Sequence, residues 1–279
     1  MGFFKRLLDY YAKEKYAGVI FSGGEPTLYS ELAELIHYAV EKELQTRIIT
    51  NGQMTADINY LRSLKEAGLN HIGVSVYSDD AKIQAFLTQN KNSLKNIIRS
   101  LDNINRLGGF TTDIITVINK YNAGHLSRIV RWIITSYPFV RHFVWNNLDP
   151  AMNRASWHLD TIPSLNDFEL ELFYAMSALR MSHRTFRVER VPLCYMADFA
   201  DSSTETRKIV KNEERMVYFL DEKNLVRQKK WQYQKAAACQ ICSCRGICAG
   251  LYQMDGYYDS KELYPLFIDK DEIIKRVIS

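Results

Sequence analysis

Cysteine is the residue type whose distribution in this chain most strongly indicates chemistry. Residues 1–193 contain none, whereas four of the five cysteines fall within ten residues. They are Cys194, Cys239, Cys242, Cys244 and Cys248. A disulfide framework spreads its cysteines over an exported chain, and the charged N-terminal residues 1–15 are typical of a helix and not of a signal peptide. Clustered thiols in a reducing compartment more often bind metal, so the spacing predicts a metal or iron–sulfur site.

A second candidate site is the glycine-rich turn Gly23-Gly24-Glu25-Pro26-Thr27-Leu28. Two adjacent glycines let the backbone turn sharply and approach a ligand without a Cβ atom in the way. The Glu25 carboxylate can accept hydrogen bonds from an ammonium group, and Pro26 stiffens the turn. The turn has neither the lysine ending of a phosphate loop nor the G-x-G-x-x-G of a dinucleotide-binding turn. An ordinary strand exit with a surface glutamate is the alternative interpretation.

Alternating strand-like and helix-like patterns must position these residues. Short runs rich in Val and Ile predict five buried strands at residues 18–22, 45–50, 71–77, 112–118 and 141–146. Amphipathic stretches with helical spacing separate them. This order predicts a parallel sheet, either open or part of a barrel, with ligands at the carboxyl ends of its strands.

Four motifs in order resemble those of the radical S-adenosylmethionine (SAM) enzymes. The glycine turn resembles that family's GGEP motif, and Thr50-Asn51-Gly52 resembles its TNG. The segment from Gly68 to Tyr77 resembles its "GL…VSLD" strand, and Val117 to Asn122 resembles a later element. The resemblance spans residues 1–150 and implies a partial (β/α)6 barrel in an α/β fold, with SAM as cofactor.

The resemblance also implies which residues bind SAM. The stretch Gly23 to Glu25 would hold the amino group of the methionine moiety, and Ser75 would hydrogen-bond its carboxylate or ribose. Thr50 and Asn51 stand at the next strand end. The expected cofactor-binding residues are Gly23, Gly24, Glu25, Pro26, Thr50, Asn51 and Ser75.

Enzymes of that family start their chemistry at a 4Fe-4S cluster held by a C-x3-C-x2-C motif, which this chain lacks. The reduced cluster cleaves SAM reductively to a 5′-deoxyadenosyl radical that abstracts a hydrogen atom from the substrate. We therefore expect that the chain is truncated by about one βα unit and does not cleave SAM alone, so no catalytic residue is assigned. The alternative is a degenerate, non-catalytic partner that binds SAM or a peptide.

The late cysteines resemble the C-terminal SPASM or twitch extension of the same family. The resemblance implies one auxiliary 4Fe-4S cluster bound by Cys194, Cys239, Cys242 and Cys248, with Cys244 as the spare thiol. Its single-cluster twitch form fits five cysteines better than the two-cluster form. A structural zinc site in a zinc-stabilised α/β binding protein is the alternative, because thiolates two residues apart also bind zinc.

These observations predict three segments and a working function. We expect a partial barrel over residues 1–150, a linker and helix over 151–185, and an auxiliary-cluster domain over 186–279. Members of the family with this extension often modify peptides or proteins, so a peptide or protein substrate is expected. No run of eighteen apolar residues occurs and the net charge is only +4. This charge argues neither for nor against a nucleic-acid partner. We expect a cytoplasmic protein without a membrane or nucleic-acid partner, in an oligomeric state that the sequence leaves open.

Overall fold

The computed structural model describes residues 1–151, 153–219 and 224–279. Residue 152, in the expected linker, and residues 220–223, in the expected auxiliary-cluster domain, lie outside this description. The α-helices are α1 (Gly2–Lys13), α2 (Leu32–Glu41), α3 (Ile58–Glu66), α4 (Ala81–Thr88), α5 (Ser93–Leu107), α6 (Leu126–Ser136), α7 (Leu165–Met181), α8 (Thr204–Lys211) and α9 (Lys270–Ile278). The strands are β1 (Gly18–Phe21), β2 (Gln45–Thr50), β3 (His71–Ser75), β4 (Thr111–Ile118), β5 (His142–Asn147), β6 (Thr185–Glu189), β7 (Arg215–Tyr218) and β8 (Leu225–Gln228).

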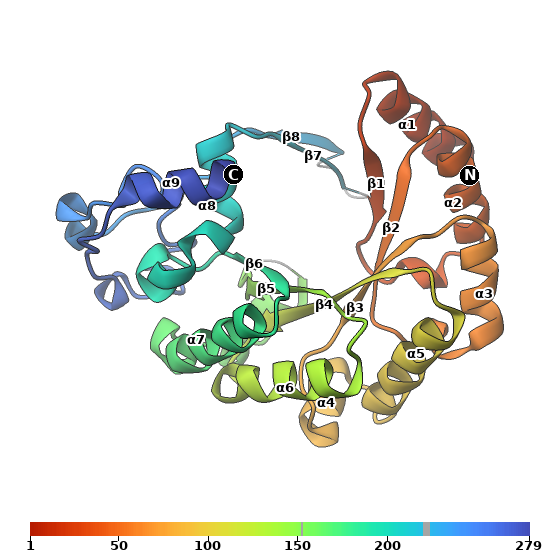
Figure 1. Ribbon diagram of the computed structural model, residues 1–279, viewed down its shortest axis with the longest axis horizontal. Helices are drawn as coiled ribbons and strands as arrows, with labels where there is room; N and C mark the ends of the chain where they lie inside the picture. Colours follow the sequence, from red (N-terminus) through yellow and green to blue (C-terminus); the bar gives the residue numbers. More distant parts are fainter. Residues whose placement is uncertain (152, 220–223) are drawn as a thin grey trace. The chain divides into compact units, whose positions relative to one another are not determined.

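Strands β1 to β6 form one six-stranded sheet in chain order (Figure 1). The register pairs β1 with β2, β2 with β3, and β3 with β4 in parallel. Helices separate consecutive strands, as parallel crossovers require. The arrangement is a parallel half-barrel, which confirms the α/β partial-barrel prediction. Strand β6 extends the sheet beyond the five strands expected from the sequence.

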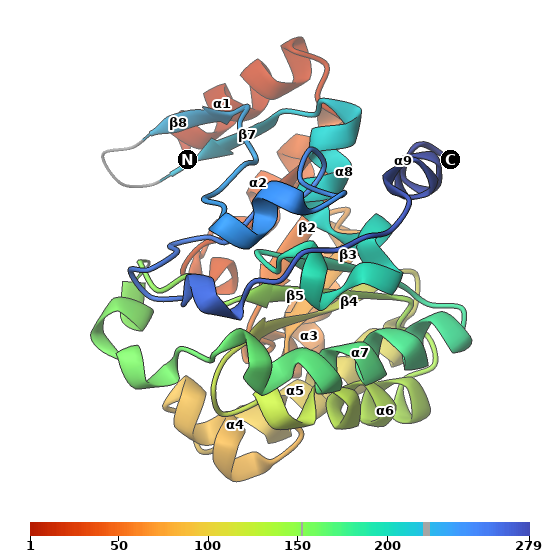
Figure 2. The ribbon, with the colours of Figure 1, turned by 90° about the vertical axis from the view of Figure 1, so that its left-hand side faces the viewer.

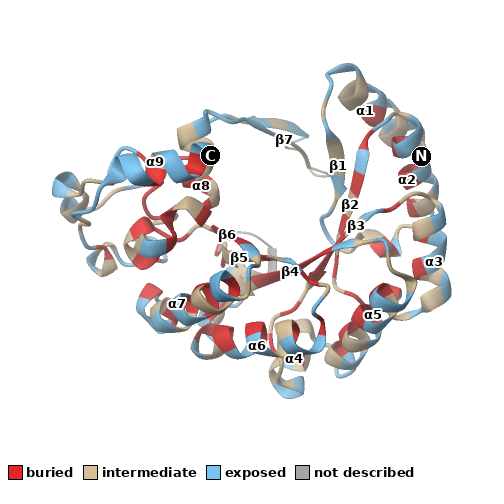
Figure 3. Cartoon of the chain, in the orientation of Figure 1, coloured by how far each residue is buried: buried red, intermediate tan, exposed pale blue. Residues whose placement is uncertain are grey.

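The chain folds into two compact units. The first comprises Met1–Thr116 and Arg128–Phe143, and the second comprises Val117–Ser127 and Val144–Ser279. In the first unit, the buried residues lie on the strands and on the helix faces toward them (Figure 3). There Leu8 of α1 packs with Leu35 and Ala39 of α2 and with Leu44, because the apolar stripe of each helix faces inward.

The second unit contains α7 to α9 and a separate hairpin. Helix α7 begins with a capping box in which the Ser164 hydroxyl accepts from the Asp167 N–H and the Asp167 carboxylate accepts from the Ser164 N–H. Strands β7 and β8 pair in antiparallel fashion as a two-stranded sheet of their own (Figure 2). In the described part of the chain, no helix has both the length and the apolar character needed to cross a bilayer.

A buried ion-pair cluster ties three strands of the first unit together. The Asp113 side chain on β4 is 1% exposed, and its Oδ2 lies 2.7 Å from Nη2 of Arg47 on β2 and 2.7 Å from Nε2 of His71 on β3. Gly73 leaves space beside these groups, since a Cβ there would lie 2.6 Å from the Ile115 side chain and 3.5 Å from Arg47 Nη2. The cluster therefore locks the register of adjacent strands.

Replacing Asp113 with Ala should destabilise this unit strongly. The substitution leaves the part-buried Arg47 guanidinium without its counter-ion, and breaking a buried pair costs about 3 kcal/mol. Urea denaturation followed by circular dichroism measures the change. The matched control is Asp9→Ala, which removes an exposed pair with Lys42 and an exposed hydrogen bond from the Tyr38 hydroxyl and should change the urea midpoint much less. Equal midpoints for the two variants would contradict the role given to Asp113.

Candidate functional site

The carboxyl ends of the first three strands bring most of the predicted SAM-site residues to one edge of the first unit. Thr50, the last residue of β2, pairs in register with Val74, so Ser75 lies one residue further along β3. The turn that begins at Ser22 leaves β1 at the same edge, because β1 and β2 run parallel. Tertiary structure thus collects segments from three consecutive βα units.

Backbone conformation accounts for the two adjacent glycines. Gly23 has φ +88° and Gly24 has φ +53°, a region that other residues enter only with strain. A Cβ at either position would meet no atom within 4 Å. Packing therefore does not require glycine here, but the left-handed turn does. The turn also leaves open space beside its backbone, which a ligand could approach.

The Glu25 carboxylate holds this turn against the end of β2. Its Oε1 accepts hydrogen bonds from the Thr27 N–H at 3.1 Å, the Thr27 hydroxyl at 2.5 Å and the Thr50 hydroxyl at 2.7 Å. Its Oε2 accepts from the Asn51 N–H at 2.6 Å. Four donors occupy most of the acceptor sites of a carboxylate. Glu25 therefore positions the turn relative to Thr50 and Asn51.

The remaining predicted SAM-site residues lie beside this network. Pro26 is the first residue of a short 3-10 turn, Pro26–Leu28, for which Glu25 is the N-cap. Ser75 is half-buried at the end of β3. Among the hydrogen bonds that the structure describes, none is accepted by the carbonyl oxygen of Gly23 or of Gly24. The assignment of these residues to SAM stays a prediction.

Exchanging Glu25 for Gln should loosen the turn. The amide NH₂ would face at least one donor that now points at the carboxylate, and a lost hydrogen bond in such a part-buried network costs about 1 kcal/mol. We expect Glu25→Gln to lower the free energy of unfolding by that amount in urea titrations. Glu66→Gln, an isosteric change at an exposed position of α3, is the control and should have no effect. Indistinguishable titration curves would rule out the proposed role of the carboxylate.

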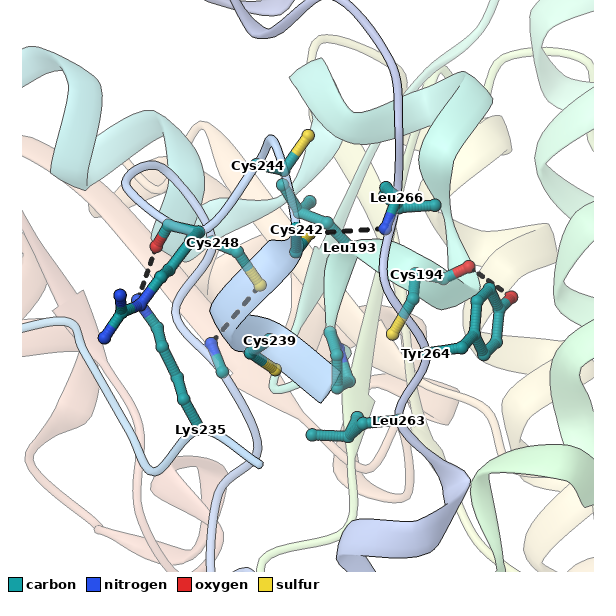
Figure 4. A pocket seen from close by; sticks show the side chains of 13 residues that line it. Leu193, Cys194, Lys235, Cys239, Cys242, Cys244, Cys248, Leu263, Tyr264 and Leu266 are labelled. Carbon is teal, nitrogen blue, oxygen red and sulfur yellow. Dashed lines mark hydrogen bonds between the residues drawn. The ribbon is translucent and has the colours of Figure 1, made fainter. Parts of the chain in front are cut away.

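The second candidate site is a pocket in the second unit that all five cysteines line. Cys194 comes from the segment after β6, and the other four follow the β7–β8 hairpin. Figure 4 shows the sulfurs of Cys194, Cys239, Cys242 and Cys248 around a common space. The sulfur of Cys244 is turned away from those of Cys239 and Cys248, and its side chain is fully buried beside the Ser243 hydroxyl.

Backbone N–H groups point at two of these sulfurs. The Leu266 N–H donates to Cys242 Sγ at 3.3 Å, and the Gly250 N–H donates to Cys248 Sγ at 3.3 Å (Figure 4). Gly250 has φ +94°, and a Cβ there would lie only 2.2 Å from the Gln234 carbonyl oxygen. Glycine is therefore required for this N–H to reach the sulfur. Such donors stabilise thiolates and tune the potential of iron–sulfur sites.

The thiols themselves are poor acids in the absence of a metal. Burial raises the pKa of Cys194 to about 12 and raises the pKa of Cys248 and of Cys244. A buried thiolate is costly without a compensating positive charge. Binding of a metal group must therefore displace protons, and its affinity should rise with pH.

The donor set fits a sulfur-ligated metal group. Within the described residues, no three His, Cys, Asp or Glu side chains converge closely enough to hold a single ion as they stand. The four sulfurs instead surround a space whose lining includes no carboxylate or imidazole. The lining does include two cationic side chains, Lys235 and Arg245. Sequence reasoning missed both the Leu266 donor and these cations, since no spacing rule links them to the cysteines.

The fold and these two sites define a half-barrel α/β protein with a glycine turn at its strand ends and a thiol-lined pocket in its second unit. Residues 3–133 match the model of the Radical SAM superfamily. The matched segment covers the glycine turn, Thr50, Asn51 and Ser75, and it ends before the first cysteine.

Curated relatives match in short segments. The Fe-coproporphyrin III synthase of Methanosarcina barkeri is 43% identical over 72 residues, which are 26% of this chain and 18% of that protein. The PqqA peptide cyclase of Rhodopseudomonas palustris is 38% identical over 79 residues, 28% of this chain and 21% of that protein. The matches thus cover less than a quarter of the length of these relatives.

A solved structure shares the fold over nearly the whole chain. It is anSMEcpe with bound AdoMet and Kp18Cys peptide, with a TM-score of 0.62 and 15% identity. The likeness covers 99% of this chain and 86% of that chain. At this identity the similarity concerns the fold alone.

Proposed function

We propose that this chain is part of a radical SAM protein that modifies a peptide or protein substrate and carries one auxiliary 4Fe-4S cluster. The observation that carries the proposal is the thiol pocket, in which Cys194 joins three cysteines from a segment more than forty residues away. A peptide substrate is supported by the similarity to a PqqA peptide cyclase and by the shared fold with anSMEcpe, whose structure includes a peptide.

The geometry of the thiols favours a cluster over a single zinc ion. Zinc needs four ligands at about 2.3 Å from one point, which brings the sulfurs close together. In a 4Fe-4S cluster each thiolate binds a different iron, so the sulfurs stand further apart around a larger core. Four thiols from separate turns around one pocket support the second arrangement.

Cys194, Cys239, Cys242 and Cys248 would hold this cluster, and the Leu266 and Gly250 N–H groups would stabilise its thiolates. Bound there, the cluster would supply a one-electron redox centre, since four cysteine ligands leave no iron open to substrate. Cys244 would remain a buried, protonated thiol, because its sulfur is turned away from those of Cys239 and Cys248.

At the strand ends, the residues of this chain would bind and orient SAM. The free carbonyls of Gly23 and Gly24 would accept hydrogen bonds from the ammonium group of the methionine moiety. Glu25 would keep these carbonyls in place through its ties to Thr50 and Asn51. The Ser75 hydroxyl would donate to the carboxylate or ribose.

Serine substitutions test the cluster ligands directly. We expect the anaerobically purified protein to contain iron and sulfide with a broad visible absorption. Cys194→Ser, Cys239→Ser, Cys242→Ser and Cys248→Ser should each lose most of the bound iron, because serine is a poor ligand for iron–sulfur clusters. Cys244→Ser is the matched control and should keep it. Metal analysis and absorption spectra provide the measurement.

Two outcomes would reject this assignment. A colourless protein with one equivalent of zinc would favour the zinc-stabilised binding protein. Loss of iron in Cys244→Ser with retention in Cys194→Ser would exchange the roles of these two cysteines.

Calorimetry with SAM tests the strand-end site. The chain should bind SAM, and Ser75→Ala should weaken binding about 3- to 10-fold, as expected for one lost hydrogen bond. Ser63→Ala, at an exposed position of α3, is the control and should bind as tightly as the parent. Absence of heat at millimolar SAM would reject binding.

The 279-residue chain by itself should not cleave SAM. No cysteine stands in residues 1–193, so the loops after strands β1 to β5 offer no thiolates for a SAM-binding cluster. Incubation with dithionite and SAM should form no 5′-deoxyadenosine above a protein-free control, as measured by liquid chromatography and mass spectrometry. Formation in amounts equal to the protein would contradict this expectation.

A further inference from the structure

Helix α7 is apolar on two opposite faces, of which only one is covered. Its inner face packs six buried residues, Leu165, Phe168, Leu172, Ala175, Met176 and Leu179. Its outer face carries four large apolar side chains that are 40% to 82% exposed, Leu170, Phe173, Tyr174 and Met181. At 3.6 residues per turn these four form one stripe, here called the α7 stripe, opposite the buried residues. A surface helix normally has a single apolar face, so the α7 stripe indicates a contact beyond this chain.

Ring contacts hold part of the stripe in a fixed arrangement. The Phe173 ring centroid lies 5.9 Å from that of Tyr174 and 5.8 Å from that of Phe199, both in edge-to-face geometry. Phe199 is buried, so it anchors the exposed Phe173 ring to the core of the second unit. A surface that is already ordered loses little side-chain entropy when a partner covers it.

Charge is distributed unevenly along α7 and the residues that follow it. Residues 165–179 include three acidic residues and no basic one. Residues 180–184 include two arginines, one histidine and no acidic residue. An apolar stripe that is acidic toward one end and basic at the other is complementary to a copy of itself that runs in the opposite direction.

Glu169 and Arg180 flank the stripe on the same side, because eleven residues make about three helical turns. The Glu169 carboxylate accepts a hydrogen bond from the Tyr264 hydroxyl at 2.7 Å, which fixes its position. Nη2 of Arg180 lies 3.4 Å from Oδ1 of Asp201, but the same oxygen lies 3.2 Å from Nη1 of Arg276 and cannot neutralise both arginines. The Arg180 side chain is 44% exposed and therefore retains donors for a further carboxylate.

We propose that the α7 stripe pairs with the α7 stripe of a second copy of this chain, in an antiparallel dimer with two-fold symmetry. In such a contact each surface covers its own equivalent. Glu169 lies five residues before Tyr174, and Arg180 lies five residues after Ala175. A two-fold axis beside Tyr174 and Ala175 therefore brings Glu169 of each copy opposite Arg180 of the other. A parallel pairing would place equal charges side by side.

The length of the stripe sets the expected affinity. From Leu170 to Met181 it extends about 17 Å, at 1.5 Å per residue. One helix pair of this length buries less than the ~800 Å² per partner that is usual in stable complexes, so the dimer should dissociate in the micromolar range. The stripe does not line the thiol pocket, and the strand-end site belongs to the other unit. Dimer formation therefore requires neither SAM nor a cluster.

Sedimentation velocity measures this association directly. In reducing buffer, which keeps the five thiols from forming disulfides, the chain should change from monomer to dimer between about 1 and 200 µM. Leu170→Ser and Met181→Ser should each raise the dissociation constant about tenfold, because one substitution removes two apolar contacts per dimer. Leu225→Ser, at a 41% exposed position of β8, is the matched control and should dimerise like the parent. Circular dichroism should show the same helix content in every variant.

Charge exchange tests the antiparallel geometry. Glu169→Arg alone and Arg180→Glu alone should each weaken association about tenfold, since either homodimer contains two pairs of like charges. An equal mixture of the two variants should recover the affinity of the parent, because both pairs in the mixed dimer are again opposite in charge. Recovery on mixing cannot come from variants that are merely misfolded. Lys95→Glu, at an exposed position of α5, is the control and should neither weaken association nor rescue another variant.

Three results would overturn the dimer. The first is a parent chain that stays monomeric at the highest concentration, and the second is dimerisation of the two serine variants at the affinity of the parent. The third is a mixture of the charge variants that associates no better than either alone. If the monomeric parent instead sediments with phosphatidylglycerol vesicles, the α7 stripe is a membrane-binding surface and not a dimer contact.

Discussion

The Glu25 carboxylate is the interaction on which the strand-end site depends. It accepts hydrogen bonds from donors on both sides, those of Thr27 in its own turn and those of Thr50 and Asn51 after the next strand. Parallel strands end at the same edge, but their loops are not otherwise bound to one another. One half-buried acceptor group joins two of these loops, and no hydrogen bond that the structure describes uses the carbonyls of Gly23 and Gly24.

The thiol pocket is assembled from segments that lie far apart in the sequence. Cys194 stands just after β6, and Cys239 follows the β7–β8 hairpin. Leu266, a further 24 residues beyond Cys242, supplies an N–H to that sulfur. Buried thiols with raised pKa values resist ionisation until a metal supplies positive charge. Under the proposed function, a metal group that binds in this pocket displaces protons from its thiols.

The two sites give the chain a division of roles. Residues 3–133 match the Radical SAM superfamily and contain the strand-end site, whereas every cysteine lies after them. In the proposed function, the half-barrel binds and orients SAM, and the thiol pocket holds a redox centre. Each role uses residues of a single compact unit.

The sequence by itself determined the class of fold and the candidate residues. Val- and Ile-rich runs separated by amphipathic stretches predicted the parallel sheet, because a strand buried on both faces must be apolar throughout. The glycine pair predicted a sharp turn, and Gly23 and Gly24 form it with left-handed backbone angles. These are local properties, set by side-chain period and by backbone sterics.

Tertiary structure decided what the candidates contact. The four donors to Glu25 and the N–H groups aimed at Cys242 and Cys248 depend on loops that approach only after folding. The sequence left Cys244 as the spare thiol, and only the folded chain turns its sulfur away from Cys239 and Cys248. Hydrogen bonds and side-chain direction depend on three-dimensional neighbours, which no spacing along the chain specifies.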